Sequence, residues 1–377
     1  MTDHRLRRFL AVIIATLLSL GCVAVYSATA IPGAAYYGQS LRFVAHHLLA
    51  IGLGLGVGFG CLAIPPERLR QSAKLLVALS VILLVVVGVC GAEIGGARRW
   101  FRLGRLSLQP SEFAQLALVV YLADFLARKR AVIQQVREGV LPPVLVTGGL
   151  AGLVLLQPDL GTAIVMASVL LLLLVVAKAR WQHLQIVLVI GLIALVVLVA
   201  GVDYRRRRIL AFLHPEQDPL GAGFQILQSY MALADGGIIG QGIGASMQKL
   251  FYLPGAHTDF IFAIMGEELG LIGTTAIIGL FGLLVACGLR MAHGMEDLFQ
   301  KYLICGCVGL IGSEALVNMA VVTGLLPTKG LPLPLVSYGG TSMVGNLVAC
   351  ALIFHASRRR PAVTLGMLTC ASAGAPS

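Results

Sequence analysis

Charged residues are scarce in this chain. Only 28 of its 377 residues are Lys or Arg and 17 are Asp or Glu, so 12% are charged, whereas 58% are hydrophobic. A soluble domain carries about 25% charged residues, so this composition excludes an ordinary soluble fold. It also gives no reason to expect a nucleic-acid partner. Because the apolar runs have the length of spanning helices, we predict an all-α polytopic membrane protein.

The sequence has no cysteine pattern that would indicate a disulfide bond or a metal cluster. None of the eight cysteines lies in the long polar stretch 202–258, and the pair Cys305 and Cys307 is too small a set for a site. Gly240, Gly242 and Gly244 follow no strand and precede no βαβ unit, so they are not a dinucleotide fingerprint. We therefore predict no disulfide and no organic cofactor.

Ten apolar runs are long enough to cross a hydrocarbon core of about 30 Å. They occupy 9–29, 45–64, 73–91, 110–127, 140–156, 159–177, 183–201, 259–290, 301–323 and 334–356. Residues 1–360 then form one transmembrane domain, in which 202–258 is a long loop between the seventh and eighth helices. The Ala-, Gly-, Ser- and Pro-containing stretch 361–377 is predicted to be a disordered tail.

The distribution of basic residues predicts the orientation. Seventeen Lys and Arg residues fall on the side of the two termini, against six in the short loops of the other side. Cytoplasmic loops are enriched in Lys and Arg, so both termini are expected in the cytoplasm and the long loop outside.

An acidic stretch stands at the entrance to the eighth run. Thr258 is predicted to cap the helix, with Asp259 in its first turn and Glu267 and Glu268 about two turns further on. An acid near a helix start needs no function, because the helix dipole stabilises it by about 0.3–1 kcal/mol. Two further carboxylates at the edge of a span favour a functional site, since acids near lipid are rare.

Other charged residues are predicted on the same outer side. Glu112 and Asp159 open two further runs, while Arg99, the run Arg205–Arg208 and Lys329 come from three separate loops. Anchoring at the interface explains most such cations, but cations around an acidic mouth also suit a substrate that carries phosphate.

Two further features concern the last two spans. Glu314 and Asn318 share a helical face, and either helix–helix contact or a functional acid explains them. The Pro- and Gly-rich stretch 324–342 cannot form a regular helix, and such backbone at membrane depth must be buried or line a cavity. A polar cleft is therefore expected there.

These stretches together resemble the SEDS family (shape, elongation, division and sporulation), and most of all its FtsW branch. The motifs that carry the resemblance are Gly96-Ala97-Arg98-Arg99-Trp100, Gln109-Pro110-Ser111-Glu112, Gln157-Pro158-Asp159, Pro219-Leu220-Gly221-Ala222-Gly223, Ala256-His257-Thr258-Asp259, Glu267-Glu268-Leu269-Gly270, Pro327-Thr328-Lys329-Gly330 and Ser337-Tyr338-Gly339-Gly340.

The resemblance implies a peptidoglycan glycosyltransferase that polymerises lipid II at the outer face of the bacterial cytoplasmic membrane, for the division septum. It implies Asp259 as the catalytic residue and a divalent cation, Mg or Mn, for which Asp259, Glu267 and Glu268 are the candidate ligands. The substrate-binding candidates are Arg99, Glu112, Asp159, Lys329 and Ser337. The implied partners are a class B penicillin-binding protein, which is a transpeptidase, and other membrane proteins of the divisome.

The chain departs from the family pattern at three positions. Gln115 stands where Lys is usual, Gly255 where Glu is usual and Glu314 where Gln is usual. Other functions also remain open at this point. They are a lipid II flippase, an elongation polymerase like RodA, and a scaffold that recruits the transpeptidase without catalysis. Clustering of the polar residues at one face favours chemistry over transport, since a flippase needs polar groups through the full depth.

Overall fold

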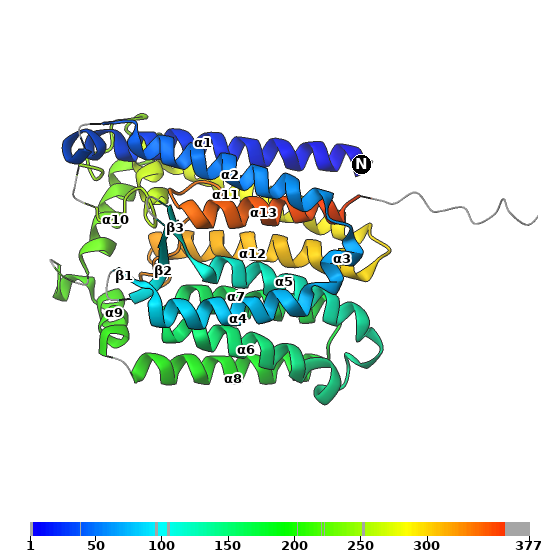
Figure 1. Cartoon of the computed structure of the whole chain (residues 1–377). Coiled ribbons are helices and arrows are strands. Elements are labelled where there is room, and N and C mark those ends of the chain that lie inside the picture. The colour runs from blue at the N-terminus through cyan, green and yellow to red at the C-terminus, as the bar shows by residue number, and fades with distance from the viewer. Residues whose placement is uncertain are drawn as a thin grey trace, which may run out of the picture.

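The helices of this protein lie side by side along one common direction. The computed structural model describes residues 3–37, 39–94, 97–103, 106–201, 203–219, 221, 223–250 and 253–358. The predicted tail 361–377 lies outside the described residues. The first helix begins and the last one ends at the same end of the bundle, here called the terminal end (Figure 1). The strands and the helices α9 and α10 gather at the opposite end, here called the loop end (Figure 1).

Ten helices of the described residues run along the bundle, and the longest connection between them joins α8 to α11. They are α1 (Asp3–Tyr37), α2 (Arg42–Ala63), α4 (Ala73–Cys90), α5 (Pro110–Arg128), α6 (Leu141–Leu156), α7 (Leu160–Val176), α8 (Trp181–Ala200), α11 (Ile261–His293), α12 (Leu298–Val322) and α13 (Gly340–Ala356). Shorter helical elements connect them: α3 (Pro66–Gln71), η1 (Arg130–Val132), η2 (Val136–Val140), α9 (Asp203–Leu213), η3 (Pro215–Gln217) and α10 (Phe224–Gly236).

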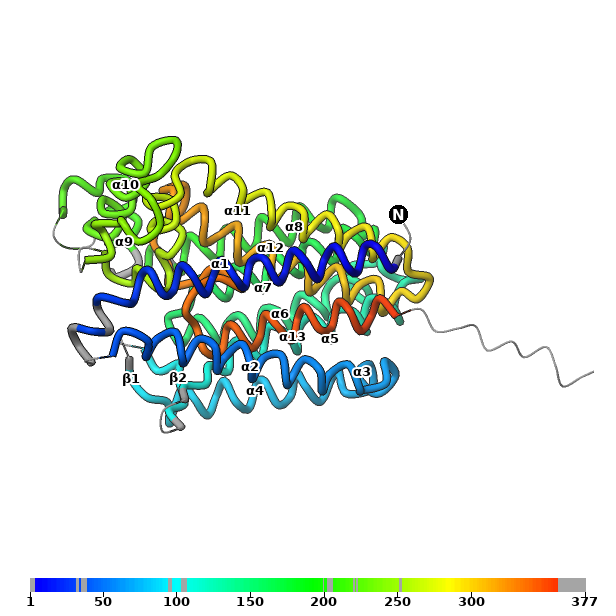
Figure 2. The backbone as a smooth tube through the Cα atoms, turned by 90° about the horizontal axis from the view of Figure 1, so that it is seen from above, coloured from blue at the N-terminus to red at the C-terminus, as the bar shows by residue number. Residues whose placement is uncertain are grey.

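The predicted polytopic helical fold is confirmed. Within the described residues, eight helices are long and apolar enough to cross a membrane, and Leu160–Val176 and Gly340–Ala356 are shorter apolar helices. These ten elements coincide with the ten predicted runs. Helices α5 and α12 are mostly buried and pack on each other at the centre, whereas α8 is largely exposed at the edge. Figure 2 shows the same arrangement from a second direction, with α2 beside α13.

A small antiparallel sheet at the loop end was not predicted. Strand β2 (Ala97–Leu103) pairs with β1 (Ala92–Ile94) and with β3 (Leu106–Leu108), between α4 and α5. Alternation along β2 turns Ala97 inward and Arg98 outward, but a seven-residue strand gives too short a pattern to stand out beside ten apolar runs. The sheet brings Arg99 over the start of α7.

Helix α11 is broken by a glycine near its start. Gly270 has φ 67° and ψ −166°, a conformation that other residues avoid, and the helix continues beyond it. The break lets the main chain of 237–242 pair with α11: Gln241 and Gly242 donate to the carbonyls of Glu267 and Glu268. The long loop is thereby fixed to residues 267–272 of α11, on both sides of the break.

Candidate functional site

Asp259 lies in a turn that precedes α11, at the loop end of the bundle. The predicted cap at Thr258 is wrong, because α11 begins at Ile261 and the Thr258 hydroxyl bonds to the Gly255 carbonyl. The physical reason is that the segment is held from outside the helix. Its main chain makes tertiary hydrogen bonds with 331–338 and with α12, and these override the local capping preference.

Three hydrogen bonds fix the segment 257–259. The amide of Tyr338 donates to the carbonyl of His257 (3.0 Å), and the Ser337 hydroxyl donates to the carbonyl of Thr258 (2.6 Å). The Asn318 side chain donates both to the carbonyl of Asp259 (2.8 Å) and to that of Leu331 (2.7 Å). The catalytic candidate therefore sits on a main chain whose position is set by α12 and by the irregular segment before α13.

The Asp259 carboxylate is enclosed but keeps partial access to solvent. Its pKa is raised from 3.8 to about 7: burial is the largest cause, Arg208 and Arg99 act to lower the pKa, and the charge of Asp159 acts to raise it. Because Asp259 precedes the helix and is enclosed, burial outweighs any helix-dipole effect on its pKa. A carboxylate with a pKa near neutrality suits a general base.

Gly330 lies directly against this carboxylate. A Cβ at that position would come within 3.1 Å of Asp259 Oδ2. Because glycine has no side chain, Gly330 leaves room for another group beside the carboxylate.

Arg99 is held by the turn that precedes Asp159. Its Nε and Nη2 each donate a 2.6 Å hydrogen bond, to the carbonyls of Gln157 and Pro158. These partners are neutral, so the guanidinium keeps its full charge toward the site. The Asp159 carboxylate accepts from the amide and hydroxyl of Thr162 and caps α7.

Lys329 and Arg208 are brought together by the main chain of Thr328. Arg208 on α9 donates a 3.1 Å hydrogen bond to the Thr328 carbonyl, next to Lys329. Burial lowers the pKa of Lys329 to about 8, and Asp159 acts in the opposite direction. The cations of three separate segments, namely β2, α9 and the loop after α12, thus converge on the surroundings of Asp259 and Asp159.

Two of the predicted substrate-binding residues, Glu112 and Ser337, are buried in contacts within the protein. Glu112, in the first turn of α5, is buried and lies beside Gly345 of α13, within range of the charges of Glu314 and Asp159. Ser337 is 2% exposed, and its hydroxyl both accepts from the Leu333 amide and donates to Thr258. We assign Ser337 to positioning of the Asp259 segment.

Glu267 and Glu268 are engaged in contacts within the protein. Glu267 accepts from the Ser246 hydroxyl and from the amides of Met247 and Gln248. Glu268 pairs with Lys249 (2.9 Å) and accepts from Ser27 of α1. Among the described residues no three His, Cys, Asp or Glu side chains are grouped to hold a metal ion, so a cage of Asp259, Glu267 and Glu268 does not fit.

The sequence analysis did not identify two residues of the site individually. Arg208 was named only as part of the run Arg205–Arg208, and only the fold distinguishes it from its neighbours. Asn318 was noted only for sharing a face with Glu314, although it carries the hydrogen bonds to Asp259 and Leu331. An uncharged amide beside a buried loop gives no signal in a single sequence.

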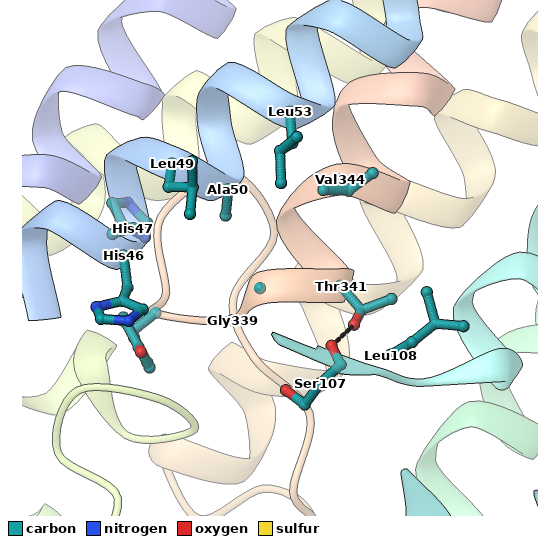
Figure 3. Close-up of a pocket in the computed structure, with 12 residues that line it drawn as sticks. His46, His47, Leu49, Ala50, Leu53, Ser107, Leu108, Gly339, Thr341 and Val344 are labelled. Carbon is teal, nitrogen blue, oxygen red and sulfur yellow. Dashed lines mark hydrogen bonds between the residues drawn. The ribbon is translucent and has the colours of Figure 1, made fainter. Parts of the chain in front are cut away.

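An apolar groove opens beside the segment that holds Asp259. Figure 3 shows it between α2, β3 and the start of α13. Its volume is about 240 Å³. Leu49, Leu53 and Val344 form its apolar walls, while Tyr338, whose amide bonds to His257, lies at its polar edge. A groove with apolar walls therefore lies next to the cleft that was predicted at the Pro- and Gly-rich stretch.

Comparison with known proteins shows which family this chain belongs to. The family model of the FtsW, RodA and SpoVE cell cycle proteins matches residues 7–361. The chain belongs to this family. It is 43% identical over 353 residues to the probable peptidoglycan glycosyltransferase FtsW of Trichlorobacter lovleyi, with 92% of each chain covered. It is 40% identical to the stage V sporulation protein E of Bacillus subtilis, covering 93% of this chain and 96% of that protein.

Two solved structures share the fold. A structure described as a peptidoglycan synthase complex that coordinates polymerisation and crosslinking matches with a TM-score of 0.74 and 33% identity, covering 92% of this chain and 96% of that one. The rod shape determining protein RodA of Thermus thermophilus matches with a TM-score of 0.68 and 30% identity, covering 93% of this chain and 97% of that one. The family membership predicted from the motifs is thus confirmed.

Proposed function

We propose that this protein is a peptidoglycan glycosyltransferase that polymerises lipid II, in septal cell-wall synthesis. Relatives about 40% identical over nearly the whole chain are named for this activity. The observation that carries the proposal is the position of Asp259. It is an enclosed carboxylate with a pKa near 7, and the cations Arg99, Arg208 and Lys329 lie around it.

The proposed reaction is a sugar transfer with inversion. Asp259 takes the proton of the 4-hydroxyl of the acceptor N-acetylglucosamine while that oxygen forms a bond to the anomeric carbon of the lipid-linked strand. The bond from this carbon to the diphosphate oxygen breaks, and undecaprenyl diphosphate leaves with the electron pair. General-base help contributes about 10²–10⁴-fold, so positioning and charge stabilisation supply the rest.

The cations of the site would stabilise the negative charge that develops on the leaving diphosphate. Arg99 bonds to the turn before Asp159, and Lys329 lies within range of the Asp159 charge. A guanidinium and an ammonium bind diphosphate as fork and point charge. The apolar groove of Figure 3 suits the polyprenyl tail, since leucine and valine side chains line it and Tyr338, which also lines it, donates its amide to the carbonyl of His257.

A divalent cation, Mg or Mn, remains part of the proposal. Magnesium is commonly bound by one or two carboxylates together with substrate phosphates, so Asp259 and the substrate diphosphate form a suitable donor set. Such an ion would neutralise charge on the leaving diphosphate. Glu267 and Glu268 are left out of this donor set because their oxygens serve internal contacts.

The proposed orientation puts the loop end outside the cytoplasmic membrane. The excess of Lys and Arg near the terminal end supports it, because that end would then face the cytoplasm. The expected partners are a class B penicillin-binding protein, which supplies transpeptidase activity, and other divisome membrane proteins. The likeness to the solved peptidoglycan synthase complex, which coordinates polymerisation and crosslinking, supports such a partner.

The test is lipid II polymerisation by purified protein reconstituted with its transpeptidase. We expect Asp259→Asn to lower polymer formation by about 10²–10⁴-fold. Asp235→Asn, an exposed acid of α10, is the matched control and is expected to retain activity. Full polymerisation by the Asp259 variant would overturn the assignment.

The same preparation separates the remaining alternatives. Polymer formed from lipid II supplied only on the outer leaflet supports the enzyme, whereas movement of lipid II without polymer supports a flippase. Septal function restored by Asp259→Asn in cells would support a scaffold. The likeness to RodA keeps an elongation role as the second candidate, and the site of the tagged protein in dividing cells tests it.

A further inference from the structure

A second groove lies at the terminal end, far along the bundle from Asp259. It runs between α1, α2 and α13 and has a volume of about 380 Å³. Leu55 and Phe59 of α2 and Leu347 and Phe354 of α13 form apolar walls. In Figure 2 these helices lie beside one another at the end where the chain begins and α13 ends.

Two arginines stand at the mouth of this groove. Arg7 comes from the second turn of α1 and Arg358 follows the end of α13, and both line the groove. The Nε of Arg7 is buried and has no hydrogen-bond partner among the described residues. Arg358 reaches toward α2, where its Nη1 donates a long 3.4 Å hydrogen bond to the Leu62 carbonyl.

The charge of this mouth is uncompensated by the groove itself. No Asp or Glu is among the described residues that line it. A buried guanidinium donor costs free energy unless it is paired, and an anionic oxygen is its strongest partner. The groove therefore presents an anion-binding mouth above an apolar channel.

The length of the channel matches one leaflet of a bilayer. From Leu347 to Ala356, the last residue of α13, the helix advances nine residues, which is about 14 Å, and Arg358 follows two residues later. Half of a hydrocarbon core measures about 15 Å. A phosphate held at the two arginines would place an acyl chain along the full channel.

We propose that this groove binds an anionic phospholipid of the leaflet at the terminal end, with its phosphate between Arg7 and Arg358 and an acyl chain against Phe59 and Leu347. Basic pockets between membrane helices at the cytoplasmic side are suited to anionic lipid headgroups. The bound lipid would connect α1 and α2 to α13. The start of α13 follows Tyr338, whose amide donates to the carbonyl of His257 near Asp259. The site is independent of the proposed glycosyl transfer.

Native mass spectrometry of the full-length protein in detergent tests the proposal. The probes are phosphatidylglycerol, phosphatidylcholine with the same acyl chains, and glycerol phosphate without chains. We expect phosphatidylglycerol to bind about 25-fold more tightly than phosphatidylcholine, because each of the two arginines near an anionic headgroup is worth about fivefold in affinity. Glycerol phosphate, which has no acyl chain, is expected not to compete.

Two pairs of variants locate the site. Arg7→Gln combined with Arg358→Gln is expected to remove the preference for phosphatidylglycerol. Arg5→Gln combined with Arg8→Gln removes the same charge from exposed positions of α1 that do not line the groove, and is expected to keep it. Leu55→Trp, which fills the channel from an exposed position, is expected to weaken both lipids equally.

Several results would overturn the proposal. Equal binding of the two lipids to the unmodified protein would do so without any variant, so misfolding of a variant cannot hide the answer. Equal losses in the two arginine pairs would mean that general surface charge attracts the lipid. Competition by glycerol phosphate at the concentration of the lipid would mean an anion site without a lipid channel.

Discussion

The side-chain amide of Asn318 donates a 2.8 Å hydrogen bond to the main-chain carbonyl of Asp259. The same amide reaches the carbonyl of Leu331 at 2.7 Å, so one side chain of α12 ties together the two segments that face each other across the site. Asn318 itself is 2% exposed and does not contact solvent freely. It is a positioning residue, because it acts on the main chain and not on the reacting atoms.

Replacing Asn318 with Ala is expected to lower kcat by about tenfold to a hundredfold, because a small misplacement of a catalytic group has effects of this size. KM is expected to change little, since the cations remain in place. The variant also leaves two carbonyls unpaired, which costs about 1–3 kcal/mol of stability. Steady-state polymerisation kinetics and thermal unfolding in detergent measure both effects. Thr323→Ala, at an exposed position directly after the end of α12, should change neither quantity. A purely structural role would predict that activity follows the fraction of folded protein.

The rate of polymerisation is expected to rise with pH through a midpoint near 7. A general base must be deprotonated, and burial raises the pKa of Asp259 to about 7, so activity is lost as the pH falls below this value. Arg208 lowers this pKa, so Arg208→Gln should move the midpoint upward. Arg207→Gln, an exposed neighbour on α9, should leave the midpoint in place. A profile that is flat from pH 5 to 9 would exclude Asp259 as the base.

Asp259 is expected to reduce stability above neutral pH. Its folded pKa is raised above the unfolded value of 3.8, so the unfolded chain releases the proton first and stability falls as the pH rises from about 4 to about 7. Asp259→Asn should therefore unfold at a higher temperature than the unmodified protein at pH 8, and at the same temperature at pH 4. The gain is at most about 4 kcal/mol, and less because the carboxylate keeps contact with solvent. Asp235→Asn is the control, and a gain that is independent of pH would contradict this account.

The buried pair Lys249–Glu268 is expected to hold the long loop on the bundle. Both side chains are about 95% buried, at 4% and 5% exposure, and the pair also contacts Ser27 of α1. Lys249→Met should cost about 3–5 kcal/mol, because it leaves a buried carboxylate without its partner. Adding Glu268→Gln to this variant should recover much of that loss, which unfolding in detergent can measure. Lys129 and Glu138 form an exposed pair at 3.7 Å, and Lys129→Met should change stability by less than about 1 kcal/mol. Equal costs at the two pairs would contradict the structural role of Lys249.

The membrane-spanning architecture was predictable because hydropathy and helix length are local quantities. The ten apolar runs coincide with ten helices. The irregular backbone before α13 was also predicted, from its prolines and glycines. The sheet at the loop end was missed because β2 has only seven residues, and its strands depend on their neighbours for hydrogen bonds. The cap at Thr258 was wrong because tertiary bonds to 257–259 outweigh a local preference.

The sequence by itself determined the kind of protein and its acidic candidate. A chain with 12% charged residues must bury its backbone in helices within lipid, and Asp259 stands at the entrance to one of them. Only the tertiary structure decided which charges surround Asp259, that Glu267 and Glu268 face inward to Ser246 and Lys249, and that Ser337 and Asn318 hold the loop. The reason is distance along the chain: Arg99, Arg208 and Lys329 are brought together by helices whose packing no local pattern encodes.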